Sequence, residues 1–322
     1  MAWRFEPGEE LRDAFRRVAT EEIAKVRASL SAPHPDLETA IHEARQGFKR
    51  LRALVRLAKP QLGADFSVEN RRWRDASRLL SGSRDTTVLL QTFDKVTAKC
   101  DGQLPASLCR KLRARIASNA RKNGAADVEP HLREVLALLD EADGAMAHLN
   151  WPDSPSALLK GLRKSQGRLR KYWKKASVTT EPDALHSWRK SVKDQAAQLR
   201  LFRQIMPRKI RARRNDEKAA GELLGDEHDL WLLSEHLRAQ TAPRELAAAC
   251  DVLVAEIEKD RKALREGAFK KGKAFSSESA KSFAGAVCSA WEKASARRSV
   301  AQQRKRRRSN GAASGSATSP GP

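Results

Sequence analysis

The chain matches itself when it is shifted by 144 residues, and charged residues are among the matches. Apolar matches can arise from helical periodicity alone, but a shared histidine, two arginines, a lysine and an aspartate in one register are much harder to obtain by chance. We therefore predict two related halves, at about residues 1–150 and 151–298. The matched polar pairs are His42 with His186, Arg45 with Arg189, Lys49 with Lys193, Arg56 with Arg200 and Asp85 with Asp229.

Both halves are expected to be helical. Leu, Ala, Arg, Lys and Glu recur at helical spacing between Pro and Gly residues, and alternating β-branched runs are scarce. The predicted fold class is all-α, with two pseudo-symmetric helical bundles. The predicted helices lie near residues 8–30, 36–59, 67–81, 84–99, 105–123, 127–149, 155–176, 182–205, 209–225, 228–240, 244–272 and 277–297.

A file of cations follows one side of the predicted helix at 36–59. Its members are separated by steps of three, four, three and four residues, so on an α-helix they form one narrow stripe about 21 Å long. A second stripe, made of apolar residues, runs beside it and predicts a core-facing side. A solvated charged face is the ordinary interpretation, but the repeat favours a functional one. The candidate binding residues are His42, Arg45, Lys49, Arg52 and Arg56 in the first half, and His186, Arg189, Lys193 and Arg200 in the second.

The second stripe is thinner than the first. Arg50 corresponds to Asp194 and Arg52 corresponds to Ala196, whereas Lys190 lies nearby as a replacement. An equal share of contacts from both halves is therefore not expected.

The charge of the chain predicts an anionic partner. There are 63 Lys and Arg residues against 40 Asp and Glu residues, a formal net charge of +23, which attracts nucleic acid, anionic lipid or polyphosphate. The last segment, residues 299–322, turns from basic to rich in Gly, Ser and Pro and is predicted to be a disordered tail. The folded domain is expected over residues 1–298.

Catalysis, cofactors and membrane insertion are not expected. The sequence has no phosphate-binding glycine loop, no zinc-protease motif, no nucleophile elbow and no dinucleotide fingerprint. Its four cysteines are widely spaced, so we expect them to be reduced and mostly buried. No apolar run approaches 18 residues and the N-terminus has no apolar signal core, which favours the cytoplasm.

Two pairs of segments resemble the CHAD domain, the conserved-histidine α-helical domain. The first pair is "IHEARQGFKRLRALVRL" with "LLSGSRDTTVLL", and the second is "LHSWRKSVKDQAAQLRLF" with "LLGDEHDLWLL". Each shows a His, an Arg three residues later, a basic cluster and a later Arg-Asp or His-Asp element. The resemblance covers about residues 1–298. It implies two helical bundles around a basic central cavity that binds inorganic polyphosphate, with an association with polyphosphate granules.

Alternatives remain for the protein and for single residues. A nucleic-acid-binding basic helical protein is the second hypothesis, because the surface charge and the "RKRRR" tail would suffice for it. His42 and His186 are interpreted as buried hydrogen-bonded residues, as phosphate donors or as metal ligands. Asp85 and Asp229 are expected to cap a helix or orient a neighbour. Trp73, Trp188 and Trp231 are expected to be core anchors, with base stacking as the alternative.

Overall fold

The computed structural model describes residues 3–31, 37–80, 82–100, 102–124, 128–179, 181–239 and 244–314. Within these ranges the chain forms eleven α-helices and no strand, which confirms the predicted all-α class. Nowhere in the described helices is there a stretch both long and apolar enough to cross a lipid bilayer. The helices are α1 (Leu11–Ser31), α2 (Leu37–Leu62), α3 (Asp65–Leu79), α4 (Gly82–Lys99), α5 (Ala106–Gly124), α6 (Val128–His148), α7 (Pro155–Val178), α8 (Pro182–Leu201), α9 (Arg208–Arg238), α10 (Arg244–Ser277) and α11 (Ala280–Ser314).

Two helices differ from the prediction. A break was expected between residues 225 and 228, but α9 runs through it as one helix. A single interior glycine costs a helix only about 1 kcal/mol, and packing against α8 and α10 compensates for it here. Helix α11 continues beyond the expected domain end at residue 298 to Ser314, so the tail begins as a helix rather than as disordered chain. Ala, Gln, Arg and Lys make up most of residues 299–314 and are all good helix formers. Residues 315–322 lie outside the described part.

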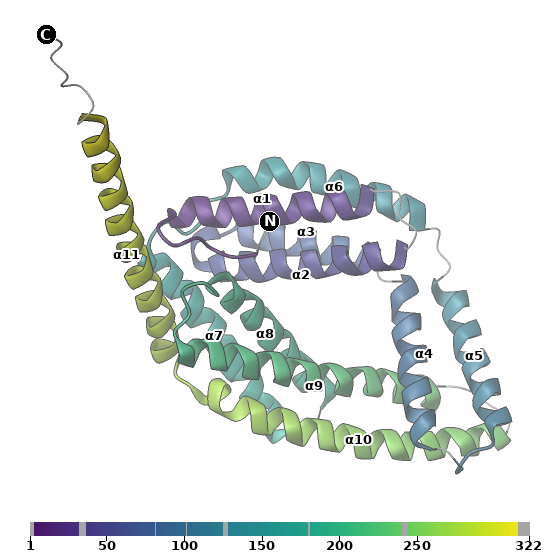
Figure 1. The fold of residues 1–322 in the computed structure, drawn as a ribbon. Helices are drawn as coiled ribbons and strands as arrows, with labels where there is room; N and C mark the ends of the chain where they lie inside the picture. The colour runs from purple at the N-terminus through teal and green to yellow at the C-terminus, as the bar shows by residue number, and fades with distance from the viewer. Residues whose placement is uncertain are drawn as a thin grey trace, which may run out of the picture.

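The first apolar cluster joins α1, α2, α3 and α6, which lie side by side in the upper layer of Figure 1. Phe15, Phe48 and Trp73 are fully buried there, and the Phe48 and Trp73 rings stack with centroids 6.0 Å apart. Residues of α7, α8 and α11 also belong to this cluster, so the second half contributes to the same core.

Two further clusters complete the fold. One joins α7, α8, α9 and α10 around Trp188. The other joins the α4–α5 hairpin to the end of α9 and the start of α10, with Phe93, Ile116 and Leu233 in its centre. In Figure 1 this hairpin runs down from the upper layer to the ends of α9 and α10. The two halves therefore share two of the three cores.

The halves meet most closely where α7 crosses α2. A Cβ atom on Gly161 of α7 would lie 2.0 Å from the carbonyl oxygen of Leu57 in α2, so only glycine permits this approach. The N-terminal segment adds bonds to α8: the Trp3 indole donates to the Ala197 carbonyl at 2.8 Å, and the Phe5 amide donates to the Leu201 carbonyl at 2.8 Å. These contacts fix α2 and α8, the two helices that carry the predicted stripes.

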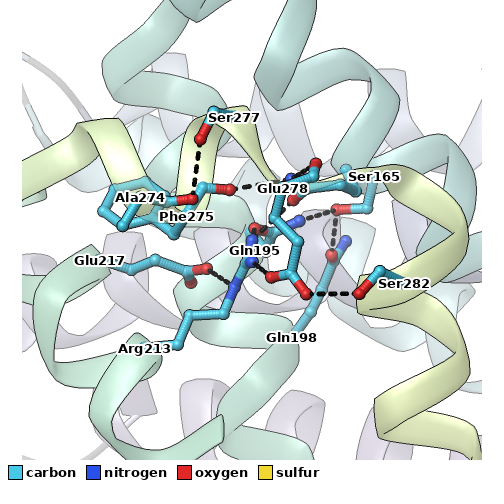
Figure 2. A network of polar contacts seen from close by, with 11 residues as sticks. Ser165, Gln195, Gln198, Arg213, Glu217, Ala274, Phe275, Ser277, Glu278 and Ser282 are labelled. Atoms are coloured by element: carbon cyan, nitrogen blue, oxygen red, sulfur yellow. Dashed lines mark hydrogen bonds and ion pairs between the residues drawn. The ribbon is translucent and has the colours of Figure 1, made fainter. Parts of the chain in front are cut away.

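A buried polar network, part of it drawn in Figure 2, also reaches α2. Arg213 of α9 donates to Gln166 at 2.6 Å and to Gln195 at 2.7 Å, and lies 4.2 Å over the ring of Phe283. Ser165 links Gln195 to Gln198, whose amide donates to the Ala53 carbonyl in α2 at 2.9 Å. Because buried polar groups need partners, this chain of bonds restricts how α2, α7, α8 and α9 can pack.

Candidate functional site

The core face of α2 decides where its cations point. Its apolar stripe, made of Ile41, Phe48, Leu51, Val55 and Ala58, is buried with no member more than 3% exposed. The predicted cationic stripe lies beside this face at the edge of the core. Lys49 is exposed, and the other four members of the stripe are half-buried: His42, Arg45, Arg52 and Arg56.

Helix α8 repeats this arrangement. Trp188, Val192 and Leu199 are fully buried and hold the helix against its neighbours. His186 and Arg189 are half-buried beside that face, and the exposed cations are Lys190, Lys193 and Arg200.

The two stripes come within electrostatic reach of each other at Lys193. Loss of hydration, followed by the charges of Arg189 and Lys49, lowers the pKa of Lys193 to about 8. Lys49 belongs to α2 and Lys193 belongs to α8. The ammonium group reaches solvent and is nevertheless surrounded by protein and by other cations.

The stripes interact again about one to two turns further along α2, at Arg52 and Arg56. Burial, followed by the charge of Arg56, lowers the pKa of Arg52 to about 10. The pKa of Lys190 in α8 is lowered by burial and then by Arg52, Arg56 and Arg189. Like charges from both halves are therefore held together in what we call the cationic cluster: Lys49, Arg52, Arg56, Arg168, Arg189, Lys190 and Lys193.

Asp194 lies inside this cluster and partly neutralises it. Its carboxylate Oδ2 accepts from Arg56 of α2 at 2.5 Å and from Arg168 of α7 at 2.7 Å. Its charge also opposes the lowering of the pKa values of Arg52 and Lys190. The residue that departs from the first-half pattern thus connects three helices.

Two glycines of α9 make room for the α8 cations. A Cβ atom on Gly221 would lie 3.5 Å from the Lys193 Cγ atom, and one on Gly225 would lie 3.7 Å from the Lys193 ammonium and 3.8 Å from Arg189. Any side chain longer than alanine at Gly225 would push into the two cations. The Nε atom of Arg189 has no hydrogen-bond partner among the described residues.

The two histidines of the predicted stripes, His42 and His186, each have an unpaired ring nitrogen and belong to no metal-binding group among the described residues. The Nδ1 atoms of His42 and His186 are both buried without a hydrogen-bond partner in the described structure. His186 stacks on His228 of α9 with ring centroids 4.4 Å apart. Burial, followed by the charges of Lys190 and Arg189, lowers the pKa of His186 to about 4, so its imidazole is neutral at pH 7. Among the described residues there is no group of three or more His, Cys, Asp or Glu side chains suited to a metal ion.

Other predicted residues take separate positions. Arg45 donates to the Leu80 carbonyl at the end of α3, at 3.3 Å. Arg200 lies further along α8, where its pKa is lowered by burial and then by Arg50 and Arg203. Asp229 of α9 contributes a charge that favours the protonated forms of Arg189 and Lys193, and the side chain of Asp85 lies outside the described part.

Two of the three tryptophans that were predicted to be core anchors are buried in the core. Trp73 and Trp188 are fully buried core anchors. Trp231 is half-buried and stacks on His228, with centroids 5.5 Å apart.

Sequence reasoning missed Arg168. It lies on α7, whose sequence shows no clear register with α1, and only the packing of α7 against α8 brings it to Asp194. The available signal was the density of Lys and Arg in "RKSQGRLRKYWKK", which does not reveal that Arg168 pairs with Asp194.

Comparison with known proteins identifies the family. The family model of the CHAD domain matches residues 10–238. The chain belongs to the CHAD family. The crystal structure of the CHAD domain from the plant Ricinus communis matches with a TM-score of 0.58 and 19% sequence identity, over 83% of this chain and 94% of that one. This likeness concerns the fold. No curated protein matches the sequence. CHAD domains are linked to polyphosphate binding in general.

Proposed function

We propose that this CHAD protein binds inorganic polyphosphate at the cationic cluster, without catalysis, and that this binding directs it to polyphosphate granules. The observation that supports this proposal is the set of like charges that α2 and α8 hold together. Lys49 lies within reach of Lys193, and Arg52 and Arg56 lie within reach of Lys190. Bringing cations together while removing water from them costs free energy, and a dense anion compensates for that cost.

Polyphosphate fits the chemistry of the cluster. It has no bases to be read and presents closely spaced anionic oxygens, which match a row of guanidinium and ammonium donors. Hydrogen bonds to charged groups contribute about 1.5–3 kcal/mol each when they are partly buried, against about 0–1 kcal/mol for an exposed ion pair. Half-buried donors such as Arg52 and Arg189 are therefore better placed than exposed cations elsewhere on the surface.

The test is a competition between polyphosphate and single- and double-stranded DNA of equal total charge, at several salt concentrations. We expect polyphosphate to displace both DNAs, with a preference that persists at high salt because half-buried contacts are screened less. Equal competition by all three polymers, falling together as salt rises, would favour the alternative of general nucleic-acid binding.

The shared cluster also predicts a dependence on chain length. A polyphosphate long enough to touch both helices gains from effective concentration, because its second contact is intramolecular. Affinity should rise steeply with length and then level off. Arg189→Ala with Lys193→Ala should flatten that rise and leave the binding of short chains largely unchanged, as measured by calorimetry with chains of defined length. If the curves of the two proteins are parallel, the halves do not share one ligand.

A further inference from the structure

A stack of three aromatic rings lies beside the cationic cluster. His186 and His228 have centroids 4.4 Å apart and planes inclined by 30°, and His228 and Trp231 have centroids 5.5 Å apart and planes inclined by 26°. Such separations are typical of favourable aromatic pairs. Because His186 comes from α8 and the other two rings come from α9, the packing of these helices builds the stack.

The stack ends on an aromatic ring outside the core. Trp231 belongs to none of the three apolar clusters of the described residues. The residue that follows it, Leu232, is 42% exposed. Trp231 itself is half-buried, so part of this residue reaches the protein surface.

The same rings are surrounded by the α8 cations. Burial, followed by the charges of Arg189, His186, Lys190 and Lys193, lowers the pKa of His228 to about 3. Arg189 and Lys193 lie over Gly225, less than one turn before His228 on α9. Both imidazoles are uncharged at neutral pH and extend the stack as neutral rings. The phosphate-binding donors and the aromatic surface are thus adjacent.

The register of α9 sets the distance between them. Gly225, His228 and Trp231 follow one another at steps of three residues, so Trp231 lies about 9 Å along the helix from Gly225 and about 120° around it. Arg189 and Lys193 lie over Gly225. His228 lies between Gly225 and Trp231 in this register, so the stacked rings connect the region of the two cations with the Trp231 ring.

We propose that this end of the cationic cluster binds nucleoside polyphosphates, with the base stacked on Trp231 and the phosphates on Arg189 and Lys193. The inference rests on the proposed phosphate binding at the cluster and adds a ligand class to it. One partly exposed indole at the end of the stack suits one base at the end of a phosphate chain better than a strand of many bases.

Calorimetry with three ligands tests this inference on the unaltered protein: adenosine 5′-triphosphate, ribose 5-triphosphate and tripolyphosphate. Ribose 5-triphosphate has the sugar and phosphates of the nucleotide and lacks only the base. Stacking on an aromatic side chain should make the nucleotide bind about tenfold more tightly than ribose 5-triphosphate. Trp231→Ala should remove this difference and leave the binding of ribose 5-triphosphate unchanged, whereas Trp231→Phe should keep part of it.

The outcomes separate the two proposals. If ribose 5-triphosphate and the nucleotide bind equally to the unaltered protein, the stacking site does not exist, although the proposed polyphosphate binding stands. If Trp231→Ala weakens all three ligands by the same factor, Trp231 acts through the fold and the inference is overturned. If neither these ligands nor long polyphosphate binds, both proposals fail.

Discussion

Replacing Asp194 by Asn should make the protein less stable and its polyphosphate binding tighter. Asp194 accepts from Arg56 at 2.5 Å and from Arg168 at 2.7 Å, and only 13% of its side chain is exposed. Breaking a fully buried ion pair costs about 3–5 kcal/mol, whereas losing an exposed one costs about 0–1 kcal/mol. Because Arg168 keeps 30% of its side chain exposed, we expect a loss of about 2 kcal/mol in the free energy of unfolding.

The effect on binding has the opposite sign. Asp194 repels a phosphate held by its neighbours, and at about 8 Å, with an effective dielectric constant between those of protein and water, this repulsion is about 1 kcal/mol. Its removal therefore tightens binding about fivefold, and the two freed guanidinium groups add donors. The gain should shrink at high salt.

The assays are urea unfolding and calorimetric titration with polyphosphate of one defined length. Asp94→Asn is the matched control, because Asp94 pairs with Arg113 at 2.7 Å on the exposed α4–α5 hairpin and its replacement changes the net charge equally. This control should bind within about twofold of the unaltered protein, since exposed charges are well screened. If Asp194→Asn binds polyphosphate more weakly, or no more tightly than the control, then Asp194 does not oppose a ligand at this cluster.

Three further outcomes are expected. Reversing the charges of Arg45 and Lys49 to Glu should weaken polyphosphate binding much more than reversing two arginines within 304–308, measured as the ratio of dissociation constants at one salt concentration. Because the pKa of Lys193 is about 8, polyphosphate affinity should fall as the pH rises from 7 to 9 and Lys193 loses its charge. In calorimetric titrations, Lys193→Arg should remove the part of this fall that is due to Lys193. Burial raises the pKa of Glu217 from 4.5 to about 7, so the folded state binds the Glu217 proton more tightly than the unfolded state does. The stability that this group contributes is therefore lost as the pH rises from 4.5 to about 7. In Glu217→Gln, the decrease in the free energy of unfolding between pH 4.5 and pH 8 should be smaller by roughly 3 kcal/mol, as measured by urea unfolding at the two pH values.

Local spacing was enough to predict the helices and the two stripes. The cations of α2 follow a helical step, and the apolar residues beside them fix which side faces the core, so both could be recognised in one short segment. The electrostatic interaction between Lys49 and Lys193 could not be recognised in this way, because it depends on how α2 and α8 pack against each other.

The continuity of α9 and the aromatic stack also could not be predicted from the sequence. Gly225 signals a possible helix end in sequence, and only the side chains of Arg189 and Lys193 above it explain why a small residue lies within a continuous helix. The segment "GDEHDLW" contains both rings that α9 adds to the stack, but the partner ring, His186, lies 42 residues earlier on another helix.

Positions 50 and 194, which the predicted repeat aligns, carry opposite charges. They are 144 residues apart, and each pairs with the preceding long helix, but with opposite charges: Arg50 of α2 pairs with Glu22 of α1, and Asp194 of α8 pairs with Arg168 of α7. An arginine at position 194 would place a further cation beside Arg56 and Arg168, where the pKa of Arg168 is already lowered by burial. The exchange of charge allows α2 and α8 to bring their cations close together without a ligand. Asp194 neutralises Arg56 and Arg168 through its ion pairs. Under the proposed function, a bound anion would add the same neutralisation for Lys49, Arg52 and Lys193.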